Sequence, residues 1–277
     1  MERRQPRKTE AFRHAGGVQA EGMMTLEDHD RYPLNRLLAH LQREDMRRLA
    51  PHLETVKLAY KQSLYRENEP IEFVYFIEDG VASLVNTMAN GAASEVGTIG
   101  NEGMVGLPVL LGDSEAPTSV YMQVPGAGSR MRASSFRHAL EHSAALRAVM
   151  LRYAHALFNQ VAQSAACAHF HALEQRCCRW LLMTHDRMAS DEFLLTHEFL
   201  AMMLGVRRAG VSQAAATLQR AGLIQYHHGR IVILDRAALE QRSCECYAVT
   251  KEEFDGLLGA APAKADGAAT RPKRGVM

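Results

Sequence analysis

The chain has 277 residues, of which 47% are hydrophobic and 23% charged, which is typical of two globular domains with some additional tail. The formal net charge of +1 excludes a polycation or a polyanion, so any contact with nucleic acid has to come from a local patch. No run of about 18 apolar residues is present and the N-terminus is polar, so we expect neither a transmembrane helix nor a signal peptide. The five cysteines are odd in number and none precedes Cys167, which favours reduced thiols in the cytoplasm.

The first half of the chain predicts a β-rich domain over residues 25–133, after a polar and disordered arm over residues 1–24. Apolar residues recur at helical spacing from Asn35 to Leu53, and the β-rich part of the domain follows this segment. The expected strands are Val56–Leu58, Phe73–Ile77, Val81–Val85, Val96–Ile99 and Val120–Val124. The expected turns are Asp79-Gly80, Asn90-Gly91, Gly100–Gly103 and Pro125-Gly126. Many short strands at this spacing indicate a compact antiparallel barrel or jelly roll, and an α+β chain overall.

The pattern changes to helical spacing over residues 134–172, where apolar residues recur at steps of three and four. No Gly or Pro occurs from Ser134 to Arg187, so this segment predicts one long helix or two in series. The apolar face of this helix has to be buried against another part of the protein. The barrel or a second copy of the same helix would cover it, and we favour a symmetric dimer.

Residues 173–250 predict a winged helix-turn-helix. Thr196 is a good N-cap for a helix over Leu195–Leu204, and Gly205 suits the tight turn before a second helix ending near Leu223. A hairpin over Ile224–Leu234, with His228-Gly229 as its turn, would form the wing. A short helix and a disordered tail are expected over residues 251–277.

Charge supports DNA binding by this segment. The region from Gly205 to Leu234 contains four arginines and no Asp or Glu, whereas residues 30–171 hold 13 Lys and Arg against 14 Asp and Glu. The residues expected to contact bases are Arg207, Arg208, Ser212 and Gln213. The residues expected to contact phosphates are Thr196, His197 and Arg230. The alternative is a helical hairpin with a solvated basic face.

The order of barrel, long helix, helix-turn-helix and wing resembles the Crp/Fnr family of bacterial transcription regulators, named after the cyclic-AMP receptor protein and the fumarate-nitrate regulator. The residues that carry the resemblance are Glu69, the stretch Tyr75–Gly80 and the motif Thr196–Leu218, within a match over about residues 30–250. The resemblance implies a cyclic-nucleotide-binding-like barrel, a homodimer on a palindromic site on double-stranded DNA, and RNA polymerase as a further partner. It implies a regulator and not an enzyme.

The chain departs from this family's pattern at the effector site. Cyclic-nucleotide binders of the family carry Gly-Glu-Leu and then an Arg that pairs with the phosphate, but this chain has Gly106-Leu107-Pro108 and Thr118-Ser119 at those places. Burying an unpaired phosphate is prohibitively costly, so we expect a degenerate pocket and no cyclic-AMP binding. The N-terminal cysteines of the iron–sulfur members are also absent. In the second helix, Ala209 replaces the family's usual Glu and Gln213 its later Arg, so the family's common half-site need not apply.

Cysteines and histidines near the end of the long helix are candidates for a redox or metal switch. They are Cys167, His171, Cys177 and Cys178. Packing as small buried hydrophobes is the favoured alternative. Cys244 and Cys246 are too close in sequence for a familiar zinc knuckle, so packing is also expected there. Overall we expect no cofactor and no bound metal.

The stretch His138–His142 matches the H-x-x-E-H pattern of inverted zinc peptidases, but a solvated helix face explains it more simply. We therefore expect no catalytic residues. A second functional reading treats the barrel as a small-molecule or protein-binding module with a degenerate helix-turn-helix. Weak binding to every duplex at low salt would favour that reading.

Overall fold

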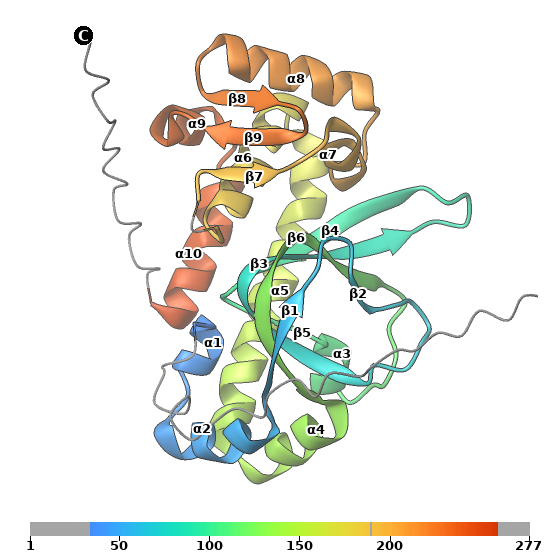
Figure 1. The fold of residues 1–277 in the computed structure, drawn as a ribbon, viewed down its shortest axis with the longest axis vertical. Coiled ribbons are helices and arrows are strands. Elements are labelled where there is room, and N and C mark those ends of the chain that lie inside the picture. The colour runs from blue at the N-terminus through green and yellow to red at the C-terminus, as the bar shows by residue number, and fades with distance from the viewer. Residues whose placement is uncertain (1–33, 189, 260–277) are drawn as a thin grey trace, which may run out of the picture.

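The computed structural model describes residues 34–188 and 190–259, and the predicted arm over residues 1–24 and the tail beyond Gly259 lie outside this range. A β-rich domain lies beside a long central helix, α5, and a smaller helical domain lies at the C-terminal end of that helix (Figure 1). No helix within the described ranges is both long and apolar enough to cross a bilayer.

The elements follow the predicted order of β-rich domain, long helix and helix-turn-helix. The helices are α1 (Arg36–Ala39), α2 (Arg43–Leu49), α3 (Leu107–Leu110), α4 (Ala133–His142), α5 (Ala144–Phe170), α6 (Leu173–His185), α7 (His197–Met203), α8 (Arg208–Arg220), α9 (Arg236–Arg242) and α10 (Cys246–Leu258). The strands are β1 (Glu54–Leu58), β2 (Ser63–Tyr65), β3 (Phe73–Thr87), β4 (Ala93–Ile99), β5 (Met104–Val105), β6 (Ser119–Arg132), β7 (Glu192–Leu194), β8 (Ile224–His227) and β9 (Arg230–Ile233). The α+β fold with a jelly-roll-like β domain is confirmed, although the sheet is not closed. Its order is β1-β6-β3-β4, with β2 on β6 and β5 on β3.

Two of the expected turns were wrong, because the chain continues through them as strand. Asp79-Gly80 lies inside β3 and Pro125-Gly126 lies inside β6, where the two long strands pair and their register shifts. Gly80 has a φ of +86°, and a Cβ on Gly126 would lie 2.1 Å from the backbone oxygen of Asp79. The glycines therefore allow a bulge and a close approach of two bent strands, and they do not end those strands.

The helix expected from Asn35 to Leu53 is also broken. It forms α1, α2 and a 3-10 turn over Ala50–His52. Asn35 caps α1 by accepting a hydrogen bond from the Leu38 amide at 2.9 Å. Gln42 has an extended backbone with a ψ of 151°, so the chain changes direction before α2 while keeping its apolar residues on the core.

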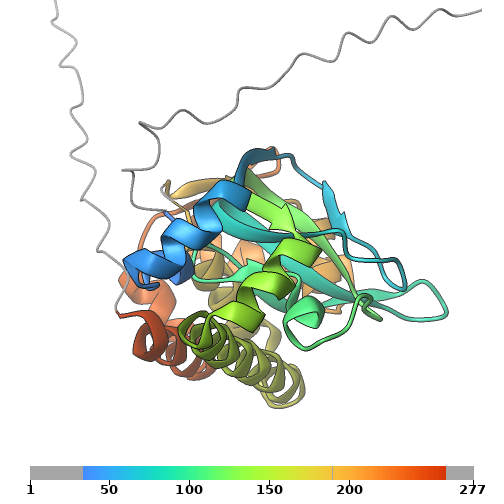
Figure 2. The same cartoon turned by 90° about the horizontal axis from the view of Figure 1, so that it is seen from below.

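The predicted long helix forms two helices in series, α4 and α5, separated by the extended residue Ser143. One face of α5 packs on the sheet through buried residues that include Met150, Tyr153 and Leu157. The C-terminal helix begins at Cys246 and not near residue 251, and it lies alongside α5 (Figure 2). Its residue Phe254 packs near Tyr153 in the core of the β-rich domain, with the two rings tilted and their centroids 6.5 Å apart.

The C-terminal part contains α6 to α9 around a small three-stranded sheet with the order β7-β9-β8. The hairpin of β8 and β9 is as expected, and both turn residues have positive φ (47° for His228, 76° for Gly229). Strand β7 was not predicted, because three residues carry too little periodicity to indicate a strand. It adds a third strand that ties the wing to the start of α7.

Candidate DNA interface

The helix-turn-helix is formed by α7 and α8, and its local signals act as the sequence indicated. The Thr196 hydroxyl accepts a hydrogen bond from the Phe199 amide at 3.1 Å and so caps α7. Gly205 has a φ of +63° in the turn, a conformation that a β-carbon would strain. Buried residues such as Val211 and Leu218 face the domain core, which leaves the other side of α8 to solvent.

Helix α8 lies at one end of the molecule, with an outer side that solvent can reach (Figure 1). Arg207, Arg208 and Gln213 are exposed on its first turns, and Ser212 is half-buried between them. The helix N-terminus adds partial positive charge at the same place, where three arginine and amide side chains point outward. The N-terminal end of α8 therefore has the exposure and the positive charge that suit contact with a polyanion.

His197 turns inward and contacts the second helix. Its Nδ1 lies 2.9 Å from the Ser212 hydroxyl and its ring stacks on Tyr226 with a centroid separation of 4.1 Å. Burial, together with the nearby Arg208 charge, lowers the pKa of His197 below its usual value. The neutral imidazole therefore links α7, α8 and the wing strand β8, and it orients Ser212.

On the wing, Arg230 is exposed and pairs with Glu192 of β7 at 2.9 Å. Both side chains are solvated, so this ion pair is weak and would exchange readily for a phosphate. The rings of His227 and His228 meet edge to face at the tip of the hairpin, with a centroid separation of 3.8 Å. Arg230 of the wing thus lies beside β7, the strand that leads into α7.

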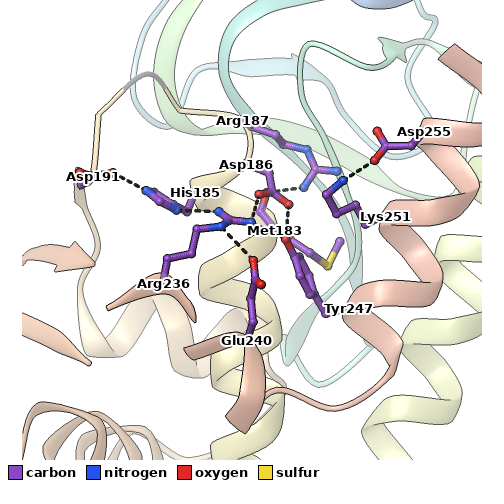
Figure 3. Close-up of polar contacts among 10 residues, drawn as sticks. All are labelled: Met183, His185, Asp186, Arg187, Asp191, Arg236, Glu240, Tyr247, Lys251 and Asp255. Carbon is purple, nitrogen blue, oxygen red and sulfur yellow. Dashed lines mark hydrogen bonds and ion pairs between the residues drawn. The ribbon is translucent and has the colours of Figure 1, made fainter. Parts of the chain in front are cut away.

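A polar network at the end of α6 holds the C-terminal helices in place (Figure 3). The Asp186 carboxylate accepts hydrogen bonds from Arg236 of α9 at 2.6 Å and from the Tyr247 hydroxyl of α10 at 3.0 Å. Arg236 also lies 2.8 Å from Nδ1 of His185 and pairs with Glu240 at 2.9 Å. These contacts fix α9 and α10 to the helix that supports the helix-turn-helix, and the sequence alone had not indicated them.

The turn Gly100–Gly103 of the β-rich domain contacts residues of α5 and of the segment just after α6. Glu102 from this turn forms a buried ion pair with Arg187 at 2.8 Å, just beyond α6. A Cβ on Gly100 would lie 2.3 Å from the Arg187 side chain, and one on Gly103 would lie 2.6 Å from the Tyr153 ring. The glycines therefore leave space for side chains from two other elements, and the turn becomes the contact between domains.

A second contact between the domains is expected to respond to pH. Glu95 of β4 accepts hydrogen bonds from Trp180 of α6 at 2.9 Å and from Ser83 of β3 at 2.6 Å, beside a cavity of about 340 Å³. Burial raises the pKa of Glu95 to about 7, although both hydrogen bonds oppose the rise. A folded pKa above the usual value means that this group's contribution to stability is complete below pH 4.5 and is lost as the pH rises through about 7.

Because Trp180 is the only tryptophan, its fluorescence reports directly on this contact. We expect the emission to change with a midpoint near pH 7, and to lose that transition in Glu95→Gln, which keeps an acceptor but carries no charge. A titration of both proteins from pH 5 to pH 9 provides the measurement. The same transition in the variant would assign it to other groups, such as the histidines.

The residues of the expected effector pocket lie around α3 and the start of β6. Gly106 precedes α3 with a φ of +111°, where a Cβ would lie 2.7 Å from the Val74 side chain. Thr118 hydrogen-bonds with Tyr65, and the Ser119 hydroxyl accepts from the Glu67 amide at 3.1 Å. Leu107 and Pro108 begin α3 itself. The side-chain hydroxyls of Thr118 and Ser119 are thus already engaged in hydrogen bonds within the chain.

The cysteines predicted as one cluster lie in two places. Cys177 and Cys178 pack in the core of the helical domain, where burial raises the pKa of each thiol to about 12 and makes them poor nucleophiles. Cys167 lies elsewhere, beside Cys244 and Cys246, and a hydrogen bond from Cys244 lowers its pKa below the usual value of a thiol. His171 lies next to this second group.

His138, Glu141 and His142 come together on α4 but are all exposed. Nδ1 of His142 is 2.8 Å from the His138 carbonyl oxygen, so Nε2 is the nitrogen of His142 that would remain for a metal. Exposed groups one helical turn apart are common on a solvated face, and no further acidic ligand joins them among the described residues.

Two family models match the chain, one for each domain. The cyclic nucleotide-binding domain model matches residues 55–143, and the Crp-like helix-turn-helix domain model matches residues 175–242. Among curated protein sequences, none matches this chain.

Solved structures with the same fold include several bacterial regulators. A transcriptional regulator of the Crp/Fnr family from Eubacterium rectale is 17% identical with a TM-score of 0.59, and the match covers 74% of this chain and 96% of that one. FixK2 from Bradyrhizobium japonicum is 16% identical with a TM-score of 0.60, covering 69% and 98%. TTHB099 from Thermus thermophilus, a transcriptional regulator of the CRP family, is 24% identical with a TM-score of 0.56, covering 68% and 96%.

Both domain models, their order along the chain and the shared fold agree with the resemblance seen in the sequence. The chain belongs to the Crp/Fnr family of transcriptional regulators, with a cyclic nucleotide-binding domain followed by a Crp-like helix-turn-helix DNA-binding domain.

Proposed function

We propose that this protein is a homodimeric regulator that reads a palindromic DNA site without cyclic AMP. The observation that carries the DNA-reading part is the exposed N-terminal end of α8, with Arg207 and Arg208 on a segment free of acidic residues from Gly205 to Leu234. Arg207, Arg208, Ser212 and Gln213 contact bases, while Thr196 and Arg230 contact phosphates. His197, predicted as a phosphate contact, acts in this proposal mainly by orienting Ser212.

The apolar stripe on the outer side of α5 supports the dimer. Leu151 and Phe158, seven residues apart on the side away from Tyr153, are 48% and 67% exposed. Large hydrophobic side chains in line on a helix are typical of a contact surface, and two copies of α5 would cover each other's stripe. Such a two-fold axis would set two α8 helices about 34 Å apart, in successive major grooves.

We expect Phe158→Glu to convert the dimer to a monomer, because two carboxylates would be buried against each other on the two-fold axis. Light scattering coupled to size exclusion measures the mass directly. Phe170→Glu is the control, since Phe170 is 78% exposed but lies off the stripe. A dimer that persists in Phe158→Glu would place the interface elsewhere.

The lack of Lys and Arg in the stretch of sequence that contains α3 supports independence from cyclic AMP. No Lys or Arg occurs from Asn101 to Ser129, while Asp113 and Glu115 lie in the loop after α3. The one buried acid nearby, Glu102, is engaged by Arg187. A cyclic phosphate would therefore meet repulsion and no partner. Isothermal titration with cyclic AMP tests this proposal, and saturable heat with unit stoichiometry would overturn it.

The first experiment is selection of the purified protein against a randomised duplex pool at near-physiological salt, with no ligand added. Enrichment of a palindrome with half-sites one helical turn apart is the expected result. Equal and salt-sensitive binding to all duplexes would favour the second candidate, a ligand- or protein-binding β domain with a degenerate helix-turn-helix.

RNA polymerase is proposed as a partner at the promoter, and the cytoplasm as the site of action, since regulators act where DNA and polymerase meet. The solved relatives described as transcriptional regulators support this reading, and we propose no catalytic role for the chain. Transcription from a selected site with purified bacterial polymerase tests it. An unchanged transcript level over a range of protein concentrations would contradict the polymerase contact or the role in regulation.

A further inference from the structure

Four side chains from two distant parts of the chain bring their ligand atoms together at the end of α5. They are Cys167, His171, Cys244 and Cys246, and these four atoms all lie within 4.8 Å of one another. The Sγ atoms of Cys167 and Cys244 are 3.5 Å apart, and the Sγ of Cys246 is 3.5 Å from Nδ1 of His171. The first and third of these residues are 77 positions apart, so only the fold unites them.

Each half of the cluster has a simple local origin. Cys167 lies in the last turn of α5 and His171 is the residue that caps it, so the two share one side of the helix end. Cys246 is the first residue of α10, and Cys244 precedes it in the short connection from α9. The i, i+4 pair and the Cys-x-Cys pair thus face each other across the contact between α5 and α10.

Ordinary packing does not account for this cluster. The three buried cysteines form an apolar group of their own, separate from the two large cores that hold the chain's leucines and phenylalanines. Their sulfur atoms face one another and an imidazole nitrogen, where a cysteine that merely fills space would face hydrocarbon. The Gln163 side chain also donates to the Cys246 sulfur at 3.0 Å.

We propose that Cys167, His171, Cys244 and Cys246 bind one Zn²⁺ ion as a structural Cys3His site. Sulfur atoms at about 2.3 Å from a tetrahedral zinc ion lie about 3.8 Å apart, and a sulfur and an imidazole nitrogen about 3.5 Å apart. The 3.5 Å between the sulfurs of Cys167 and Cys244, and the 3.5 Å between the Cys246 sulfur and Nδ1 of His171, are within a few tenths of an ångström of these values. Thiolate and imidazole ligands in a tetrahedron are the set that zinc prefers.

A second layer of contacts fits the same assignment. The imidazole Nε2 of His171 lies 3.2 Å from the Glu245 carboxylate, so its Nδ1 is left as the lone-pair nitrogen that points at the sulfurs. A carboxylate that holds the far nitrogen of a histidine is the usual support of a zinc ligand. Glu245 stands between the two cysteines of the Cys-x-Cys pair, so one short segment supplies both ligands and support.

The compactness of the cluster argues for a single ion. An iron–sulfur cluster attaches its protein ligands to separate irons and spreads them beyond a 4.8 Å sphere. Four protein ligands leave no open position, which is typical of structural and not catalytic zinc. The ion would join the end of α5 to α10 and so hold the DNA-binding domain against the central helix. This role is independent of any effector in the β-rich domain.

The test measures metal content in protein purified under reducing conditions with zinc in the growth medium. Inductively coupled plasma mass spectrometry is expected to find about one zinc ion per chain in the native protein. The Cys244→Ser, Cys246→Ser double variant should contain less than about 0.1 zinc ion per chain. Cys177→Ser, Cys178→Ser is the matched control that removes two thiols outside the cluster, and it should keep its zinc. The thermal melt of each variant verifies that it is folded.

Cobalt substitution tests the geometry without relying on a variant that folds poorly. Apo protein titrated with Co²⁺ should develop the visible absorption of a tetrahedral thiolate site, with an end point at about one equivalent. His171→Cys should retain tight zinc binding with four sulfurs, whereas His171→Ala should bind zinc at least about 10-fold more weakly. Glu245→Gln is expected to weaken it about 10-fold, and Glu252→Gln, an exposed acid on α10, should leave it unchanged.

Three results would overturn the proposal. One is native protein without zinc that also gives no tetrahedral cobalt spectrum. Another is iron and acid-labile sulfide in stoichiometric amounts, which would make the site a cluster. The last is a Cys167–Cys244 disulfide in protein handled under reducing conditions, because a bonded pair has no thiolates to offer a metal.

Discussion

Replacing Arg187 with methionine is expected to lower the free energy of unfolding by about 3–5 kcal/mol, because it leaves the Glu102 carboxylate buried without a partner. The two side chains are only 7% and 6% exposed, and Arg187 makes paired hydrogen bonds to Glu102 between 2.8 and 3.1 Å. The pair joins the β-rich domain to the end of α6, so its loss also loosens one domain from the other. Urea unfolding followed by circular dichroism gives the free energy.

The matched control is Arg48→Met, which removes an arginine from an exposed pair with Glu44 at 2.6 Å and should cost less than about 1 kcal/mol. The double variant Arg187→Met, Glu102→Gln should recover part of the loss, because no buried charge remains. If Arg187→Met is as mild as Arg48→Met, the buried pair is not what holds the domains together.

Acid should weaken the same contact. Burial alone would raise the pKa of Glu102, but the Arg187 guanidinium outweighs it and holds the pKa below the usual 4.5. A lowered folded pKa contributes stability that is present above pH 4.5 and is lost as the pH falls through the folded value. Glu95 behaves in the opposite sense, since its raised pKa costs stability as the pH rises toward 7. The two domain contacts together therefore favour a mildly acidic pH, near 4.5 and well below 7.

Replacing Arg208 with alanine is expected to weaken binding to the selected palindrome by about 1–3 kcal/mol per half-site, or roughly 5- to 150-fold, if Arg208 reads a guanine. The side chain is exposed in the first turn of α8, and its charge is close enough to depress the pKa of His197. Fluorescence anisotropy on the palindrome and on a scrambled duplex of equal length measures the loss and its specificity. The ratio between the two duplexes should fall in the variant.

Arg220→Ala is the control for charge alone. Arg220 lies in the last turn of the same helix, hydrogen-bonded to Thr217 at 3.2 Å and far from the N-terminal end of α8. It should change both affinities by less than about threefold, as expected for a distant exposed charge at physiological salt. An equal loss on both duplexes in Arg208→Ala would instead make Arg208 a phosphate contact.

Local features of the fold were accessible from the sequence because their causes are local. The Thr196 cap, the positive φ at Gly205 and the His228-Gly229 turn each depend on a few neighbouring residues, and each was confirmed. Arg207 and Arg208 could be placed on one exposed end of a helix for the same reason. The order of domains followed from a change of period from alternating to helical.

The sequence was less informative where the conformation or contacts of a residue depend on a strand or helix that is distant in the sequence. Gly80 and Gly126 were predicted as turn residues, but they lie inside β3 and β6, where the two backbones approach closely and the register shifts. The buried pair of Glu102 and Arg187 spans 85 residues, and no periodicity indicates such a pair. The contacts of His197 with Ser212 and Tyr226 are likewise set by the tertiary structure, so the sequence could not indicate them.

The sequence by itself determined the family, the order of the domains and the helix with exposed arginines at its start, because amphipathic period, capping residues and charge are properties of neighbouring residues. The tertiary structure alone decided which cysteines meet. Cys167 and His171 find Cys244 and Cys246, and not the nearer Cys177 and Cys178, because α10 returns along α5 after the wing. That long-range contact depends on how the domains pack, so the zinc site we propose is visible only in the folded chain.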